Sequence, residues 1–557
     1  MIQEKKHVAC FTVLAETSPQ ALPLGAACIA SAIKNDLHTK DKFIVDLVCY
    51  SNEDKKLSYK DIAYSLKEFF AVCFSIYVWN RDILTRIAIE IKKLNPSIIC
   101  IAGGPEATAN PESFIDFDYS IAGEGEYSVP LLLSALLSGG NIKENKDAPY
   151  GLKLGIQGIY VPSNKNHKTI LRSIPQNESF LASPYLDGTL NCNKYGGALW
   201  ELARGCPFKC SYCYESKGES KIRYLPIERL KKELELFKKQ NVSQIFVLDP
   251  TYNADKKRAL SMLRLIKQKA PDIFFYFEVR AEFIDKELAF AFASIPCSLQ
   301  IGLQSIHQNV LENIHRSFNK KLFEKNIALL NKSGAIFGFD LIYGLPGDSL
   351  NGFKESIDFA ISLYPNNIEL FCLSVLSGTT LYENASSFGL VWQNNPPYNV
   401  IKSPTFPERD IQEASNLAKA VNIFYTQGMA VPWFCAILKP LKQKASDFFT
   451  HFVPFIKKDL YTLEEIEALQ IEYVCILYKQ KHIERYLPVV QDLIVLNSAI
   501  GRCTAQGKES IVKLHYHPDD IMSGYAYDIQ FFLKNAKSLA CRVHVFYNAG
   551  QVDYKKI

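Results

Sequence analysis

The sequence predicts an α/β protein with two successive regions of parallel β-sheet and a small α+β region at the end. Short, almost continuously apolar runs alternate with helical periodicity over residues 1–140, and the same alternation returns over residues 196–395. Such alternation is typical of parallel sheets built from βα units. Beyond residue 396, helical patterns are followed only by two strand-like runs, 511–516 and 542–547. We therefore expect four parts: residues 1–140, a connector over 141–195, residues 196–395, and residues 396–557.

The composition indicates a globular chain without a strong charge preference. Its 557 residues are 48% hydrophobic and 22% charged, so a large core can be buried. A net charge of +5 is too small for this length to indicate nucleic-acid binding. No apolar run reaches the roughly 20 residues that span a bilayer, so no membrane partner is expected. Fifteen cysteines, mostly within apolar segments, suggest reduced thiols and a cytoplasmic location.

The first region is expected to form a doubly wound parallel sheet of the Rossmann type. Strands are predicted at residues 7–14, 43–50, 70–77, 97–102 and 118–122, separated by helices at 24–34, 59–69, 81–94 and 127–137. Continuous apolar strands are typical of sheets covered on both faces. Ligands of such sheets bind at the carboxyl ends of the strands, so the loops there are the candidate binding elements.

Four of these loops are distinctive. They comprise residues 16–25, residues 75–80, the segment Gly103-Gly-Pro-Glu-Ala-Thr108 and the segment Gly123-Glu-Gly-Glu126. Paired glycines let a backbone approach a bulky ligand closely. The G-x-G-x-x-G pattern is missing after the first strand, which argues against a nicotinamide or flavin site. Any one loop is adequately explained as a tight turn, but four at one sheet edge indicate a ligand site.

The second region is expected to form a partial (β/α)6 barrel. Strands are predicted near residues 199, 244–248, 274–279, 298–303, 336–342 and 368–374. Consecutive βα units close into a parallel barrel or part of one, with the active site at the carboxyl ends of the strands. Polar residues gather there: Asp249, Thr251, Glu278, Arg280, Gln304, Ser305 and Asp340.

Three cysteines follow the first strand of this region with the spacing Cys-x3-Cys-x2-Cys: Cys206, Cys210 and Cys213. Such a loop can wrap three thiolates around one [4Fe-4S] cluster, which usually takes four cysteine ligands. One iron would then be open to another ligand. A zinc site is the alternative, but zinc prefers four closed ligands and no fourth Cys or His lies close by in sequence.

This stretch resembles the signature of the radical S-adenosylmethionine enzymes, Cys-x3-Cys-x-aromatic-Cys, with Tyr212 as the aromatic residue. The resemblance implies that the open iron chelates the amino and carboxylate groups of S-adenosylmethionine and that Tyr212 lies near the adenine.

The polar strand ends extend this resemblance. Glu278 and Arg280 match positions that contact the ribose or the methionine carboxylate, Gln304 and Ser305 end a strand beside the ligand, and Asp340 precedes a Gly-Leu-Pro-Gly segment near the adenine. The usual Gly-Gly-Glu after the second strand is absent. Asp249 and Thr251 stand there and are candidates for the amino-group contacts.

The loops of the first region resemble the cobalamin-binding domain that precedes the barrel in one large class of these enzymes. The resemblance implies cobalamin contacts from Thr17, Ser18, Leu24, Ser75, Tyr77, Trp79, Asn80, Gly103, Gly104, Pro105, Glu106, Gly123, Glu124, Gly125 and Glu126. A D-x-H-x-x-G loop, whose His ligates cobalt in many other cobalamin proteins, is not found. The lower face of cobalt is therefore expected to lack a His ligand, and Tyr77 and Trp79 are candidates to cover it.

These resemblances imply a cobalamin-dependent radical S-adenosylmethionine enzyme with a [4Fe-4S] cluster, S-adenosylmethionine and cobalamin as cofactors. The preferred interpretation is a methyltransferase acting on a carbon of a small-molecule or peptide substrate, with a flavodoxin- or ferredoxin-type reductant. No catalytic residue is assigned. A rearrangement or cyclisation with the same cofactors stays open, as does a cobalamin or redox sensor. A methylthiotransferase is disfavoured because the cysteines of residues 1–140 lie in predicted strands or helices.

Overall fold

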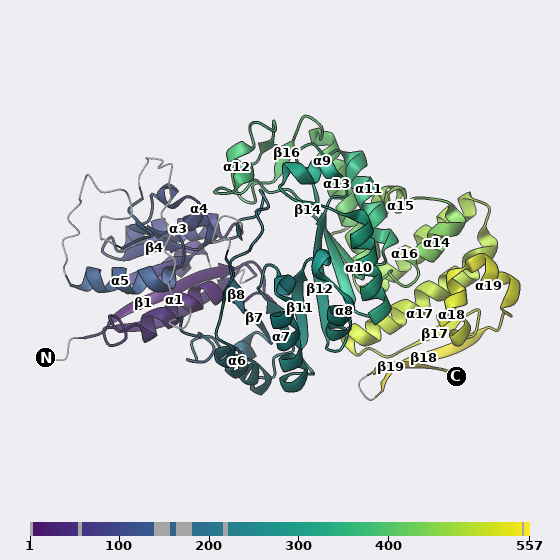
Figure 1. Cartoon of the computed structure of the whole chain (residues 1–557), viewed down its shortest axis with the longest axis horizontal. Coiled ribbons are helices and arrows are strands. Elements are labelled where there is room, and N and C mark those ends of the chain that lie inside the picture. Colours follow the sequence, from purple (N-terminus) through teal and green to yellow (C-terminus); the bar gives the residue numbers. More distant parts are fainter. Residues whose placement is uncertain (1–3, 54–57, 139–155, 163–180, 216–220, 549–550) are drawn as a thin grey trace.

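The computed structural model describes residues 4–53, 58–138, 156–162, 181–215, 221–548 and 551–557. The N-terminal sheet, the second sheet and the C-terminal region lie one after another along the longest axis of the molecule (Figure 1). The connector predicted over residues 141–195 falls largely outside the described residues.

The N-terminal sheet has the strand order β2-β1-β3-β4-β5-β6. Its strands are β1 (Lys6–Leu14), β2 (Phe43–Ser51), β3 (Ala71–Ser75), β4 (Ile99–Gly103), β5 (Tyr119–Ile121) and β6 (Ile159–Tyr160). The first five are parallel, which confirms the predicted doubly wound sheet, whereas β6 runs antiparallel to β5. The order reverses between β1 and β3, and a ligand crevice forms outside such a reversal.

Helices cover both faces of this sheet. They are α1 (Leu24–Asn35), α2 (Tyr59–Ser65), α3 (Arg81–Leu94), α4 (Pro105–Ala109) and α5 (Gly125–Leu137). One core joins α2 and α3 to Ala9 and Phe11 of β1, and the other joins α1 and α5 to Val8 and Cys10 of the same strand. Because alternate residues of a strand enter opposite cores, the strand is apolar along its whole length.

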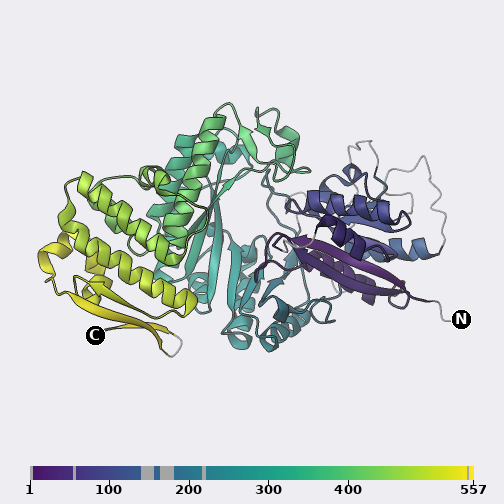
Figure 2. The same ribbon diagram turned by 180° about the vertical axis from the view of Figure 1, so that it is seen from behind.

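The second sheet has the order β14-β13-β12-β11-β10-β7, and all neighbouring strands are parallel. Its strands are β7 (Gly197–Trp200), β10 (Gln244–Val247), β11 (Phe274–Val279), β12 (Cys297–Gln304), β13 (Ile336–Tyr343) and β14 (Asn367–Cys372). The accompanying helices are α6 (Ile227–Lys239), α7 (Lys256–Lys269), α8 (Lys286–Phe292), α9 (Gln308–Asn313), α10 (Lys320–Ser333) and α11 (Leu350–Ser362). Over the described residues β7 and β14 remain edges, so the predicted partial barrel is confirmed as an open one (Figures 1 and 2).

The chain after β14 is mainly helical and ends in a small antiparallel sheet. Its elements are α12 (Thr380–Asn384), β15 (Val391–Trp392), β16 (Val400–Lys402), α13 (Glu408–Val421), a π-helix (Asn422–Gln427), α14 (Phe434–Leu441), α15 (Ala445–Phe452), α16 (Leu463–Gln480), α17 (Leu487–Gln506), β17 (Ser510–Leu514), α18 (Pro518–Met522), α19 (Ile529–Asn535), β18 (Cys541–Asn548) and β19 (Gln551–Lys556). Thr462 and Glu465 form a capping box at the start of α16. The core of this region, including Phe424, Phe434 and Phe448, is continuous with that of the barrel.

Among the described residues, none of the helices combines the length and the apolar composition that a bilayer-spanning segment requires.

Candidate functional site

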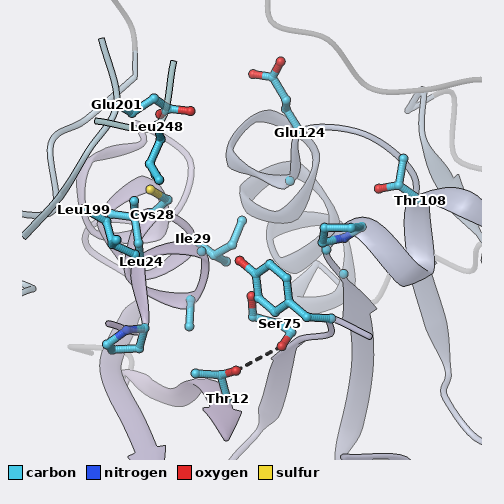
Figure 3. A pocket seen from close by; sticks show the side chains of 18 of the residues that line it. Thr12, Leu24, Cys28, Ile29, Ser75, Thr108, Glu124, Leu199, Glu201 and Leu248 are labelled. Carbon is cyan, nitrogen blue, oxygen red and sulfur yellow. Dashed lines mark hydrogen bonds between the residues drawn. The ribbon is translucent and has the colours of Figure 1, made fainter. Parts of the chain in front are cut away.

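A cavity of about 830 Å³ lies at the carboxyl ends of the N-terminal strands, at the boundary with the second region. Its lining includes Thr12 of β1 and Ser75 of β3, where the Thr12 hydroxyl donates a hydrogen bond of 3.0 Å to the Ser75 carbonyl oxygen (Figure 3). Leu199 and Leu248 enter from the second region beside Leu24 of α1. The cavity therefore occupies the crevice where the strand order reverses and is closed by the barrel domain.

Most of the predicted cobalamin contacts line this cavity. They are Leu24, Ser75, Tyr77, Trp79, Gly103, Gly104, Pro105, Gly123, Glu124, Gly125 and Glu126. These residues come from the ends of four strands that are far apart in sequence. The structure thus brings the four distinctive loops together at one edge of the sheet, as their positions after the strands predicted.

The other four predicted contacts lie outside the lining formed by the described residues. Asn80 is buried, and its side-chain amide donates to the Thr12 hydroxyl at 3.1 Å and to the Val13 carbonyl oxygen at 3.0 Å. Glu106 is buried in an ion pair of 2.7 Å with Arg81. These two side chains support the loops from behind.

The remaining two, Thr17 and Ser18, lie on the exposed side of the first loop. The Thr17 hydroxyl donates to Ser51 Oγ at 3.3 Å, and the Ser18 hydroxyl donates to Glu16 at 2.7 Å. Their hydroxyls hold the loop to itself and to β2.

Close backbone packing gives the cavity its shape. Gly104 has φ +97°, and a Cβ there would lie 2.6 Å from the carbonyl oxygen and 2.9 Å from the nitrogen of Ile76. Only glycine fits where these two loops touch. Tyr77 stacks on Trp79 with ring centroids 4.5 Å apart and an interplanar angle of 8°, and 55% of Trp79 is exposed. A glycine cradle beside a flat aromatic pair suits a large planar ligand.

The three cysteines lie on one loop whose stem is a small antiparallel ladder, β8 (Ala203–Arg204) with β9 (Arg223–Tyr224). Gly205, with φ +87°, turns the chain out of the stem immediately before Cys206. Cys206 and Cys210 are buried, and Cys213 is partly exposed. Over the described ranges, no three His, Cys, Asp or Glu side chains gather around a point where one metal ion would bind. The loop carries three thiols, at positions 206, 210 and 213, and cysteine thiolates are the usual ligands of an iron–sulfur cluster.

Asp249 and Thr251 lie next to this loop. Asp249 Oδ1 accepts hydrogen bonds from the backbone N–H groups of Leu202 at 3.0 Å and Ala203 at 2.9 Å, and burial raises the pKa of this carboxyl to about 7. The Thr251 hydroxyl lies 3.9 Å from Cys206 Sγ. Asp249 therefore fixes the chain as it enters the cysteine loop, and Thr251 faces the first cysteine.

Two carboxyl groups stand on the inner face of the open barrel. Glu278 of β11 is accessible to solvent, but the surrounding protein raises its pKa to about 6, and the charge of Glu215 adds to the effect. Asp340 of β13 accepts a hydrogen bond from the Gln300 amide, and burial raises its pKa to about 7. The raised pKa values shift both groups towards the protonated form, in which a carboxyl group donates as well as accepts a hydrogen bond.

The end of β12 carries a polar atom in need of a partner. Gln304 has φ +67°, and its buried Oε1 has no hydrogen-bond partner among the described residues. Such a group is rare in folded proteins, and this oxygen can accept a hydrogen bond from a ligand. The buried Ser305 Oγ accepts from the His307 N–H at 3.3 Å, so its role in the structure is local.

Arg280 and Arg316 approach the cysteine loop from the barrel. Arg280 lies 3.8 Å from the ring centroid of Phe208, between the first two cysteines, and forms an ion pair of 2.6 Å with Glu282. Arg316 donates to the Tyr212 hydroxyl at 3.3 Å and to the Gly302 carbonyl oxygen at 2.7 Å. Sequence reasoning missed Arg316, since it lies in an irregular segment thirteen residues beyond the predicted strand end at residue 303.

A network of charged residues joins the cysteine loop to the N-terminal domain. Arg204 forms ion pairs with Glu124 at 2.5 Å, with Glu126 at 2.7 Å and with Glu201 at 2.9 Å, and Arg223 pairs with Glu124. The sequence indicated Glu124 and Glu126 as ligand contacts but gave no signal for their arginine partners, which lie 78 to 99 residues away in the chain.

Comparison with known proteins gives consistent matches. Residues 200–360 match the Radical SAM superfamily. An uncharacterized methyltransferase of Pyrococcus horikoshii is 26% identical, over 69% of this chain and 82% of that protein. The cobalamin-dependent radical SAM methyltransferase TokK of Streptomyces tokunonensis is 24% identical, over 63% of this chain and 54% of its own length, so this chain spans about half of TokK.

Among solved structures, the cobalamin-dependent S-adenosylmethionine radical enzyme OxsB, with aqua-cobalamin and S-adenosylmethionine bound, has a TM-score of 0.58. The similarity covers 86% of this chain and 81% of OxsB at 15% sequence identity. It shows that the two chains share a fold.

Proposed function

We propose that this chain, whose residues 200–360 form a radical S-adenosylmethionine domain, is a cobalamin-dependent methyltransferase that acts on a carbon of a small-molecule or peptide substrate. One observation carries the proposal: the cavity between the domains is lined both by Gly103 and Gly104 of the N-terminal loops and by Gly205 and Tyr214 of the cysteine loop. The proposed cobalamin site and the proposed cluster site therefore open into the same cavity, where their ligands can react with each other. When bound, the cluster, S-adenosylmethionine and cobalamin supply an electron, an activated methyl group and a methyl carrier.

The cysteine loop holds the cluster in this proposal. Cys206, Cys210 and Cys213 are its thiolate ligands. Asp249 fixes the stem, and the Ser211 N–H donates to the Ile314 carbonyl oxygen at 3.0 Å, which anchors the middle of the loop to the barrel. Such supporting contacts orient metal ligands and are part of the site.

The barrel face supplies the contacts to S-adenosylmethionine. Arg316 is a cation beside Tyr212, and a guanidinium can hold a carboxylate with two parallel hydrogen bonds. The unpartnered Gln304 Oε1 can accept a hydrogen bond from an amino group. Glu278 and Asp340 offer carboxyl groups to hydroxyls and ring nitrogens. Together they present a polar surface of mixed charge, as the ligand requires.

The N-terminal loops hold cobalamin. Gly103 and Gly104 let the backbone approach the ring, and the stacked pair Tyr77 and Trp79 covers one of its faces and excludes water there. No histidine lines the cavity over the described residues. The proposed site thus shields cobalt without ligating it through imidazole.

The reductant is proposed to be a flavodoxin or ferredoxin, and the compartment the cytoplasm. Cys10 and Cys73 are direct partners across β1 and β3 and form no disulfide, which supports a reducing environment. The small net charge supports the absence of a nucleic-acid partner.

The test is an anaerobic assay of the full chain, reconstituted with iron, sulfide and hydroxocobalamin and given methyl-deuterated S-adenosylmethionine with each reductant. Deuterium in the recovered cobalamin together with 5′-deoxyadenosine supports the proposal. Deoxyadenosine without label in cobalamin points to a rearrangement or cyclisation. Bound cobalamin with neither product, in the presence of reductant, supports a sensor and overturns the proposal.

A further inference from the structure

The stem of the cysteine loop places two arginines side by side. Arg204 of β8 and Arg223 of β9 are direct partners in the antiparallel ladder. Like charges directly opposite each other in a ladder are destabilising. Glu124 relieves this repulsion, because its two carboxylate oxygens form ion pairs with the two arginines separately. Glu124 therefore stabilises the stem in this form by bridging the two arginines.

Burial makes the ion pairs of Glu124 sensitive to the position of its side chain. The side chains of the network are between 13% and 23% exposed, so the charges are largely removed from water. A buried charge that loses its partner is strongly destabilised. Burial opposes ionisation of Glu126, but the charge of Arg204, its hydrogen bond to Glu126 and smaller contributions together lower the pKa of Glu126. A small shift of Glu124 thus carries a large electrostatic penalty.

Glu124 belongs to both sites. It lies in the loop after β5, between Gly123 and Gly125, and its side chain stands across the cavity from Thr12 (Figure 3). Its partner Arg204 is separated from Cys206 by Gly205 alone. A ligand that seats the loop of residues 123–126 therefore sets the position of the stem, and the stem sets the start of the cysteine loop.

We infer that Glu124 is a positioning residue that couples cobalamin binding to the geometry of the cluster loop. The inference rests on the proposed function, which supplies cobalamin as the ligand of the cavity. Coupling between two sites is reciprocal, so an assembled cluster must raise the affinity for cobalamin by the same factor by which cobalamin favours the cluster-bound loop.

The test compares hydroxocobalamin binding to the full chain with its cluster reconstituted and after removal of the cluster by chelation. Coupling of typical size makes binding about fivefold or more tighter with the cluster present. In Glu124→Gln this ratio of Kd values should fall to about one, because the neutral amide no longer separates the arginine charges. Arg223→Gln tests the Arg223–Glu124 ion pair by changing the arginine in place of the glutamate. The EPR spectrum of the reduced cluster should change when hydroxocobalamin is added to the wild type, and it should stay the same in Glu124→Gln.

Glu467→Gln is the matched control. It breaks an ion pair of similar burial, with Arg502 at 8% and Glu467 at 18% exposure, between α16 and α17 of the C-terminal region, and it should leave the ratio unchanged. A wild-type ratio of one overturns the inference. Equal weakening of both cluster states by Glu124→Gln also overturns it, since that result shows only a lost contact. Failure of the wild type to bind hydroxocobalamin in either state instead refutes the proposed function.

Discussion

Replacing Gly104 with alanine should open the cavity edge and weaken cobalamin binding. Gly104 sits at φ +97° and ψ −176°, a region of backbone conformation that is essentially restricted to glycine. The new Cβ would lie 2.6 Å from a backbone oxygen of Ile76, and a backbone atom cannot move aside by changing a rotamer. The loops after β3 and β4 must therefore separate.

The cost follows from these contacts. The strained backbone contributes about 1–3 kcal/mol. Separation of the loops also weakens the hydrogen bond of 2.8 Å from the Ile76 N–H to the Gly103 carbonyl oxygen, which contributes about 0.5–1.5 kcal/mol. We expect a local destabilisation of about 2–4 kcal/mol and, since about 1.4 kcal/mol corresponds to a factor of ten, at least a tenfold rise in the Kd of hydroxocobalamin.

Two measurements check this prediction. Hydrogen exchange followed by mass spectrometry reports the free energy of local opening, which is better defined here than global unfolding of a chain with several regions. Peptides from β3 and β4 should lose protection in the variant. Equilibrium titration with hydroxocobalamin gives the affinity.

Gly334→Ala is the control. Gly334 also has a positive φ, +77°, but an added Cβ meets no described atom within 4 Å. That variant should show only a modest backbone cost at the end of α10 and unchanged cobalamin affinity. If Gly104→Ala keeps both the protection of β3 and β4 and a Kd within about twofold of the wild type, the described contact between the loops is wrong.

Three further predictions concern the barrel side of the site. Replacing Cys206, Cys210 and Cys213 with alanine should abolish the broad iron–sulfur absorbance after anaerobic reconstitution, and unchanged iron and sulfide content would contradict the assignment of the loop. Asp340→Asn should stabilise the ligand-free protein relative to the wild type as the pH rises from about 5 to 8, because the folded-state pKa of about 7 lies above the usual value of 3.8 and stability is lost as the pH rises between the two. The difference should reach up to about 3 kcal/mol in the free energy of local opening of β13, measured by hydrogen exchange. A pH-independent difference would refute the buried carboxyl. Arg316→Gln should weaken S-adenosylmethionine binding to the reconstituted protein by about tenfold or more. Arg316→Lys should recover the affinity only partly, since an ammonium cannot form the bidentate pair. If neither variant changes the affinity, Arg316 is not part of the site.

The two parallel sheets could be predicted because short apolar runs alternate with helical periodicity, and in the N-terminal sheet the strands are apolar on both faces. In β1, Val8 and Phe11 enter different cores, so the strand is apolar along consecutive positions of the sequence. The C-terminal helices α14 and α15 were not predicted. Neither begins with a side-chain cap, and Pro440 interrupts the pattern of α14, so the usual start and stop signals are missing.

Local spacing allowed a candidate site to be predicted, but the sequence could not show which remote segments of the chain approach one another. The cysteine spacing and the loops after strands are local features. Asn80 and Glu106, by contrast, are polar loop residues whose partners Thr12, Val13 and Tyr398 are remote in the chain, so the sequence could not show that they point away from the cavity. Arg316 meets Tyr212 across 104 residues, beyond any periodic signal.

The shared core of the barrel and the C-terminal helices has a consequence for synthesis of the chain. The N-terminal domain has both of its cores once β6 has been made, and it can fold while the ribosome is still translating the barrel. The barrel cannot complete its core before the C-terminal region has been made, because that core includes residues up to Val545. Roughly 170 residues separate the end of β14 from that point, which at 5–20 residues per second leaves the nascent barrel incompletely buried for about 10–35 s. Chaperone demand should therefore be concentrated in the last third of translation, and truncations in that third should yield a folded N-terminal domain joined to an aggregating remainder.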